Sequence, residues 1–163
     1  MTVEIGELRD EVSARDGLLA LNNSNAQETS LLTRAGFDRM ISSACVATFI
    51  APSAAFLLAF EESDAYQGGH FLWFRGRFDR FLYVDRVVVA AVHRRRGFGR
   101  LLYCDLIKRA EQRGHTRVVC EVNLVPPNPT SDMFHAAHGF EEVGRATLDG
   151  GAKTVRYLLR RHR

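Results

Sequence analysis

The chain has 163 residues, of which 46% are hydrophobic, and its formal net charge is only +3. Since roughly 100 to 200 residues is the usual size of one domain, we expect a single domain over residues 1–163 with its own core. No stretch approaches the roughly 18 apolar residues of a membrane span, and residues 1–10 lack the basic start and apolar run of a signal peptide. These features argue against secretion and against insertion into a membrane.

The three cysteines, Cys45, Cys104 and Cys120, are widely spaced and flanked by apolar residues. This pattern favours buried thiols in a reducing compartment over a disulfide framework or a metal site. We therefore expect a cytoplasmic protein without a metal ion, and we do not expect a cysteine nucleophile.

The N-terminal half predicts two helices followed by a β-hairpin. Apolar residues at near-helical spacing predict a helix over residues 7–21, and a second helix is expected over residues 30–43. Short apolar runs over residues 44–50 and 55–60 predict the hairpin. Residues 61–80 mix acidic residues, glycines and aromatic residues, and we expect an ordered loop there.

The C-terminal half begins with the clearest strand of the chain. Residues 81–89 are apolar and β-branched except for Asp85 and Arg86, which is typical of a strand buried on both faces. A helical pattern follows and ends at Gly114, and residues 117–124 predict another strand. Strand, helix and strand in this order predict a parallel crossover.

The remaining elements are a short helix over residues 130–138, after a proline-rich loop, and two final strands. These strands, over residues 141–148 and 154–159, are joined through Asp149-Gly150-Gly151.

The turn Arg94-Arg95-Arg96-Gly97-Phe98-Gly99 links the buried strand to the following helix. Its glycines let the backbone approach a ligand closely, and amides at a helix start can donate hydrogen bonds to phosphate oxygens. A bare Gly-x-Gly pattern has little specificity, so a tight turn beside a solvated arginine patch is the alternative. The turn lacks the lysine of a P-loop and the third glycine of a dinucleotide fingerprint, which disfavours nucleoside triphosphates and nicotinamide cofactors.

Directly after the strand ending in Val87-Val88-Val89, this turn resembles the R/Q-x-x-G-x-G/A hallmark of the GNAT superfamily of acyl-CoA-dependent N-acyltransferases. The segment Phe134-His135-Ala136-Ala137-His138-Gly139-Phe140 is similar to the family's ending of an aromatic residue, tyrosine, three residues, glycine and phenylalanine. The resemblance covers residues 81–140. It implies an α/β (α+β) fold with a mixed, splayed sheet of about six to seven strands and about four helices. It also implies acetyl-CoA (coenzyme A) as the cofactor, with pantetheine lying in the splay.

The same resemblance assigns the residues that hold the cofactor. Strand amides would bind pantetheine and the acyl carbonyl, the turn would bind the pyrophosphate, and Asn123 would lie on the far side of the cofactor. Ser131 either meets the cofactor thiol or caps the last helix, and its neighbours Thr130 and Asp132 favour the cap. The expected set is Val87, Val88, Val89, Arg94, Arg95, Arg96, Gly97, Phe98, Gly99, Arg100, Leu101, Asn123 and Ser131.

Attack of an amine on a thioester needs a base, backbone donors and an acid. Asp85 and Glu121 lie in otherwise apolar strands, where a carboxylate must find a cation, a donor or a water-filled cleft. Either is a candidate base, and a structural pair with Arg86 or Arg117 is the alternative. Strand alternation places Glu121 and Asn123 on one face of the sheet.

His135 occupies the position of the tyrosine that, in the resembled family, protonates the departing thiolate. The resemblance therefore implies that His135 is the acid, and an ordinary histidine pKa near 6.5 would suit proton donation. The alternative is a surface or helix-capping histidine.

The acceptor side is less specific. Tyr66, His70, Trp73 and Phe74 either wall an acceptor pocket or form a satellite hydrophobic cluster. We expect direct transfer of an acetyl or small acyl group to a primary amine of a small molecule, with neither nucleic acid nor membrane as partner; a homodimer is left open. Modification of a protein N-terminus or lysine is the alternative enzyme, and a non-catalytic acyl-CoA-binding sensor is the alternative without catalysis.

Overall fold

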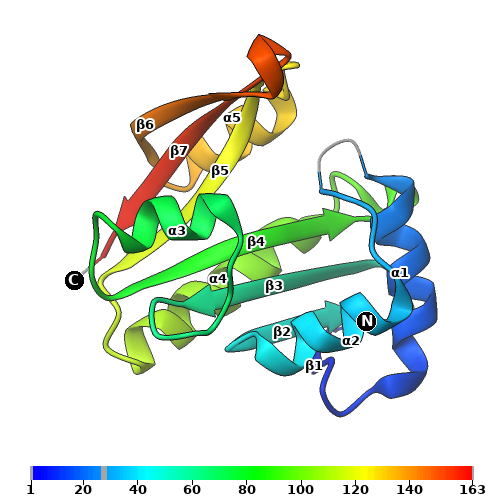
Figure 1. Cartoon of the computed structure of the whole chain (residues 1–163). Helices are drawn as coiled ribbons and strands as arrows, with labels where there is room; N and C mark the ends of the chain where they lie inside the picture. The colour runs from blue at the N-terminus through cyan, green and yellow to red at the C-terminus, as the bar shows by residue number, and fades with distance from the viewer. Residues whose placement is uncertain (1, 27–28, 163) are drawn as a thin grey trace.

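The computed structural model describes residues 2–26 and 29–162, which form a seven-stranded sheet with five α-helices on its two faces (Figure 1). The predicted mixed α/β fold is confirmed. The strands are β1 (Ile5–Glu7), β2 (Val46–Ile50), β3 (Ala55–Glu61), β4 (Phe81–Val89), β5 (Arg117–Val125), β6 (Glu141–Leu148) and β7 (Lys153–Arg161). The α-helices are α1 (Arg15–Ser24), α2 (Arg34–Ser43), α3 (Gly69–Arg75), α4 (Phe98–Gln112) and α5 (Pro129–Ala137).

The sheet order is β1-β2-β3-β4-β5-β7-β6. Only β4 and β5 run parallel, joined through α4, and the other neighbours are antiparallel. The predicted parallel unit and both predicted hairpins, β2 with β3 and β6 with β7, are therefore present.

The two central strands separate after a short paired region. β4 and β5 pair only at Phe81↔Arg117, Leu82↔Val118 and Tyr83↔Val119. β4 then continues to Val89 against β3, while β5 continues against β7, and Figure 1 shows the two strands diverging. Because the ladder between them stops at Tyr83, the β4 backbone beyond it has no strand partner on the side of the gap. This is the splay between the central strands that the family resemblance implied.

Each face of the sheet has its own hydrophobic core. On the face of α1, α2 and α3, buried phenylalanines pack together: Phe37, Phe56, Phe60, Phe71 and Phe74. On the face of α4, its buried residues pack against the sheet: Leu102, Tyr103, Leu106 and Ala110. Full burial of one such side chain stabilises the fold by about 1.5–3 kcal/mol, so both faces hold the strands that frame the gap.

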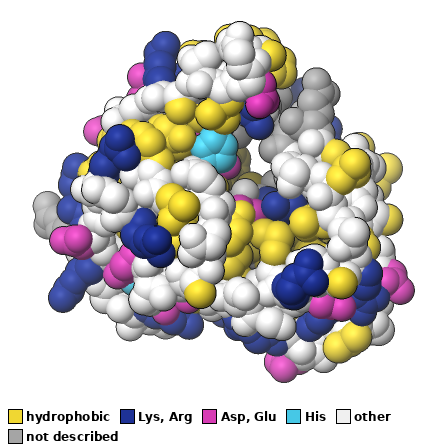
Figure 2. Space-filling model, in the orientation of Figure 1, with side chains coloured by type: hydrophobic (Ala, Val, Ile, Leu, Met, Phe, Trp, Pro, Cys, Tyr) yellow, Lys and Arg dark blue, Asp and Glu magenta, His cyan; other side chains and the backbone are white. Residues whose placement is uncertain are grey.

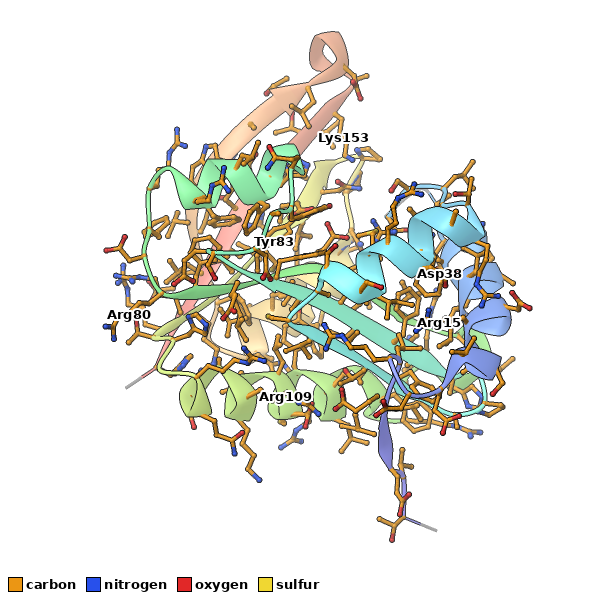
Figure 3. The ribbon with its side chains drawn as sticks, turned by 60° about the horizontal axis from the view of Figure 1, so that its bottom comes forward. Arg15, Asp38, Arg80, Tyr83, Arg109 and Lys153 are labelled. Atoms are coloured by element: carbon orange, nitrogen blue, oxygen red, sulfur yellow. The ribbon has the colours of Figure 1, made fainter. Side chains whose placement is uncertain are left out.

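The N-terminal helix was predicted too long. Residues 5–7 form β1, which pairs with the outer side of β2 at Ile5↔Ile50, and α1 begins only at Arg15 after the 3-10 turn Val12–Ala14. The apolar spacing was real, since Leu8 is buried, but pairing with a distant strand overrides local helix propensity. α2 begins at Arg34, where the Thr33 hydroxyl accepts a hydrogen bond from the Gly36 amide at 3.0 Å. Arg15 of α1 pairs with Asp38 of α2 at 3.0 Å, as labelled in Figure 3.

The predicted loop over residues 61–80 contains the short helix α3, so that expectation was wrong for its middle part. Phe71 and Phe74 are three residues apart and both face the core, which is a helical spacing. A helix of seven residues is too short to repeat this spacing, so the sequence pattern does not reveal it. Trp73 stacks on Tyr157 with ring centroids 4.0 Å apart. Trp73 and Phe74 thus belong to the packing of α3 on β7.

Two further local expectations are corrected. Asn128, rather than a residue of Thr130 to Asp132, caps α5, because its side-chain oxygen accepts a hydrogen bond from the Ser131 amide at 3.3 Å while Pro129 starts the helix. Cys104 was expected to be buried, but it lies on the exposed side of α4. Cys120 is buried as expected. In the part of the chain that the structure describes, no helix has the length and apolarity required to span a membrane.

Candidate active site

A groove of about 760 Å³ runs from the end of β4 across the start of α4 to α5. Ligand pockets typically measure about 300–1,000 Å³, so the groove can hold a sizeable ligand. Ten of the thirteen residues expected to hold the cofactor line it: Val87, Val88, Val89, Arg94, Arg95, Gly97, Phe98, Gly99, Arg100 and Ser131.

The turn before α4 has the geometry of a phosphate site. Gly97 has the left-handed φ of +81°, and no atom of residues 2–26 and 29–162 would lie within 4 Å of an added Cβ, so a ligand can approach its backbone closely. No side chain of the described residues caps the helix at this position, so the first amides of α4 are available to a ligand. Three arginines around the groove, Arg94, Arg95 and Arg100, add positive charge. The uncapped amides, the helix dipole and the arginines together suit a pyrophosphate.

The other expected cofactor residues lie elsewhere. Arg96 and Leu101 are outside the residues that line the groove, and both side chains are exposed. Asn123 lines an adjoining cavity instead. Seven other residues line the groove that the sequence did not mark as cofactor residues. They come from the α1–α2 connection, from the 3-10 turn after β4, and from α5 with its cap: Asn25, Thr29, His93, Asn128, Thr130, Phe134 and His138.

The adjoining cavity has a volume of about 290 Å³ and lies in the gap between β4 and β5. Glu121 and Asn123 both line it, as their shared strand face predicted, and so do Tyr66 and His70 from the α3 side. Figure 2 shows a hollow on this side of the molecule with a histidine at its edge and acidic and basic side chains inside. Of the four residues expected to wall an acceptor pocket, Tyr66 and His70 line this cavity, whereas Trp73 and Phe74 do not.

Glu121 faces this cavity with a raised pKa. Its carboxylate accepts a hydrogen bond from the Tyr83 hydroxyl at 2.8 Å. Arg117, the alternative partner expected for a carboxylate of these strands, donates to the Asp79 carbonyl and not to Glu121. Burial, with a smaller contribution from the charge of Asp85, raises the pKa of Glu121 to about 8, while the bond from Tyr83 acts in the opposite direction. A carboxylate with this pKa exchanges protons readily near neutral pH.

Asp85 is engaged in an ion pair. Its carboxylate lies 2.7 Å from Arg86 Nε and accepts a second hydrogen bond from the Tyr66 hydroxyl at 2.5 Å. Both charged side chains are only 6% exposed, and Arg86 also donates to the Asn22 side chain at 2.9 Å. The alternative considered for Asp85, a structural pair with Arg86, is thus formed, and no cation pairs with Glu121 among the described residues.

Arg86→Met is expected to destabilise the fold by about 3–5 kcal/mol, because it leaves the Asp85 carboxylate buried without its cation. Chemical denaturation measures the loss. The double variant Asp85→Asn with Arg86→Met should recover part of it, since the uncompensated charge is then removed. Equal losses in the single and double variants would contradict this account of the pair.

His135 is buried between α4 and α5 and lines both the groove and the cavity. Its Nδ1 lies 2.7 Å from the Ser131 carbonyl, which can only accept, so Nδ1 carries the proton and Nε2 accepts from the Tyr103 hydroxyl at 2.7 Å. The Ser131 hydroxyl lies 3.2 Å from Nδ1. Burial lowers the pKa of His135, so the ordinary value expected from sequence is wrong and the ring is mostly neutral at pH 7.

The groove and the cavity meet at five residues, Thr29, Val87, Asn128, Ser131 and His135. A ligand in the groove therefore reaches the mouth of the cavity beside His135. A groove whose end suits a phosphate group, and which opens into a small cavity that holds a carboxylate, is an arrangement compatible with group transfer between two ligands.

Comparison with known proteins identifies this architecture. A model of the acetyltransferase (GNAT) family matches residues 20–140, and the chain belongs to that family. Acetyl-CoA is accordingly its cofactor, and the protein is an acetyltransferase. None of the curated proteins matches the sequence.

Solved structures with the same fold cover nearly the whole chain at low identity. The ribosomal-protein-S18-alanine N-acetyltransferase of Escherichia coli aligns with a TM-score of 0.70 at 15% sequence identity. The alignment covers 98% of this chain and 94% of that chain. An N-acetyltransferase from Staphylococcus aureus Mu50 has a TM-score of 0.74 at 13% identity, with 99% of both chains covered. A chain of the NatC complex bound to Gag peptide and CoA has a TM-score of 0.76 at 10% identity, with 100% of both covered. At these identities the likeness supports the fold.

Proposed function

We propose that the protein transfers an acetyl group from acetyl-CoA to a primary amine of a small molecule. The observation that carries this proposal is the cavity of about 290 Å³ between β4 and β5, with Glu121 inside it and the groove at its mouth. Its walls come from the α1–α2 connection, α3 and the start of β7, and they leave room for a compact acceptor. A protein substrate would require a more open groove.

The groove residues fit the cofactor. The amides at the start of α4, together with Arg94, Arg95 and Arg100, would hold the pyrophosphate, and the unpaired edge of β4 near Val87 would hold the pantetheine arm. When bound, acetyl-CoA supplies a thioester carbonyl that an amine can attack. The β4 amides that face the gap are the available backbone donors for the carbonyl oxygen.

Glu121 is the proposed base. Its carboxylate takes a proton from the acceptor amine, either directly or through water, and Tyr83 fixes the carboxylate by donating to it. Asp85 is a less suitable base, because Arg86 and Tyr66 already occupy it. Asp85 instead contributes through its negative charge, which raises the pKa of Glu121.

His135 is the proposed acid at the departing sulfur, at the position where the family often has tyrosine. Its protonated form, a minority at pH 7, would give a proton to the thiolate and become neutral. We expect His135→Phe to leave CoA affinity nearly unchanged and to lower the rate of acetyl transfer by roughly 100-fold or more, the scale of a general acid's contribution. His135→Tyr should restore part of the rate. Single-turnover transfer by the wild type and both variants measures these effects.

A full wild-type rate in His135→Phe would overturn the role of His135. The pH profile adds a second readout, since burial lowers the pKa of His135. If the protonated ring is the acid, the rate falls as pH rises through a pKa below 6.5.

The test of the function is release of free CoA thiol from acetyl-CoA with a panel of small amines and of short peptides. Acceptor-dependent release with small amines supports the proposal. Release with peptides alone would establish a protein acetyltransferase instead, and tight CoA binding without release across both panels would establish a sensor.

The proposed location is the cytoplasm. All three cysteines are free, and burial raises the pKa of the Cys45 thiol to about 12, which keeps it unreactive. An exposed free thiol at Cys104 suits a reducing compartment.

A further inference from the structure

Lys153 is the first residue of β7 and lines the same cavity as Glu121 and His70. In the register between β5 and β7, Tyr157 lies opposite Glu121. Because side chains alternate along a strand, Lys153, Val155 and Tyr157 share one face of β7, and it is the face on which Glu121 lies. Figure 3 shows Tyr83 in the middle of the molecule and Lys153 toward its edge, where β5 has left β4.

The distance between Lys153 and Glu121 leaves room for a small ligand between them. Four residues of β7 separate Lys153 from the level of Glu121, which corresponds to about 13 Å along the backbone. Both side chains are long and line the same cavity, so the separation between their charged ends is shorter than the separation along the backbone. A molecule with two functional groups can contact both.

The ammonium of Lys153 lines the cavity without an ion-pair partner in the part of the chain that the structure describes. Among the described residues Lys153 forms no ion pair, whereas the other cation of the cavity, Arg86, is occupied by Asp85 and Asn22. Burial, followed by the charge of Lys153, lowers the pKa of His70, which shares a hydrogen bond of 2.9 Å with the Tyr157 hydroxyl. His70 is therefore mostly neutral at pH 7, and within residues 2–26 and 29–162 no ion pair compensates the positive charge of Lys153 at the outer end of the cavity.

We infer that the acceptor is an amino acid in the broad sense, a primary amine whose far end carries a carboxylate that binds Lys153 while the amine lies at Glu121. This inference rests on the proposed function and specifies its substrate class. An ammonium facing a carboxylate in a site shielded from bulk water forms a strong charge-assisted hydrogen bond. The same charge disfavours diamines, because their second ammonium would meet Lys153.

The test compares unbranched primary amines in matched sets of equal length, whose far end is a carboxylate, a methyl group or a second amine. For the wild type, kcat/KM should be at least about tenfold higher for the carboxylate than for the methyl group at the best length. Lys153→Met, which keeps the apolar stem, should remove this preference, and Lys153→Glu should shift it toward the diamine. Lys108→Met, on the exposed side of α4, is the matched control and should leave the ratio unchanged.

A binding measurement separates this inference from the proposed function. Calorimetry of the N-acetylated carboxylates, with CoA present, reports the contact with Lys153 without any turnover. If the carboxylates bind the wild type and lose affinity in Lys153→Met, yet no amine is acetylated, the substrate contact stands and the proposed function fails. If neutral amines are acetylated as well as the carboxylates and Lys153→Met changes neither transfer nor binding, the function stands and this inference is overturned. Thermal unfolding of each variant confirms that it is folded.

Discussion

Glu121→Gln is expected to lower kcat/KM for acetyl transfer by roughly 10²- to 10⁴-fold, the range attributed to a general base. The amide has nearly the same shape and can still accept the hydrogen bond from Tyr83, but it cannot take a proton at neutral pH. CoA affinity should not change, because Glu121 lines the cavity and not the groove. Steady-state transfer and calorimetry with CoA measure the two quantities separately.

The direction in which kcat/KM changes with pH follows from the raised pKa of Glu121. Since the pKa of Glu121 is about 8, its basic form is a minority at pH 7, and wild-type kcat/KM should rise as pH increases through about 8. In Glu121→Gln the limb that belongs to Glu121 should disappear, which leaves the titrations of His135 and of the acceptor amine. Glu111→Gln, on the exposed side of α4, is the control and should retain the wild-type profile. The full wild-type rate and profile in Glu121→Gln would exclude Glu121 as the base.

Gly97→Asp is expected to weaken CoA binding by roughly 100-fold or more. The new carboxylate would stand in the open space at the start of α4, where the pyrophosphate is proposed to bind, and like charges brought together cost several kcal/mol. Isothermal calorimetry measures the loss.

Gly114→Asp is a closely matched control for this change. Gly114 also has a left-handed φ, +78°, also has nothing within 4 Å of an added Cβ, and lies at the other end of α4. The strain and the charge are therefore the same in both variants, but only Gly97 lies at the groove. Equal CoA affinities in the two variants would remove the turn from the cofactor site.

The parts of the site that could be predicted from sequence are those that local chemistry marks. The turn from Arg94 to Gly99 is recognisable because glycine spacing and clustered arginines are the features that a bound phosphate group would require. Glu121 stands out because a carboxylate in an otherwise apolar strand is costly to bury unless it has a partner or a function. Asn123, two residues along the strand, lies on the same face and lines the same cavity. β4 and α4 were predicted well because each carries a long and regular apolar pattern.

The remaining parts depend on contacts that the sequence does not display. Tyr103 falls in the apolar stripe of α4 and looks like a core residue, yet its hydroxyl holds the imidazole of His135. Lys153 looks like a surface lysine in a hairpin, and only the register of β7 against β5 brings it to the cavity. β1 is three residues long and is defined by its pairing with β2, and α3 is too short to show a period.

The separation of the groove from the cavity divides the molecule into a part that can stay constant and a part that can vary. The groove is lined largely by two stretches, Val87 to Arg100 and Asn128 to His138, whereas Tyr66, residues 68–70 and Lys153 line the cavity but not the groove. If the cavity holds the acceptor, as proposed, exchanges in those outer segments are expected to alter which amine is accepted and to leave the acyl donor unchanged. In a lineage that keeps the turn from Arg94 to Gly99, acceptor preference can therefore diverge through substitutions in the segments that line only the cavity. Directed evolution toward a new amine can begin with the same segments.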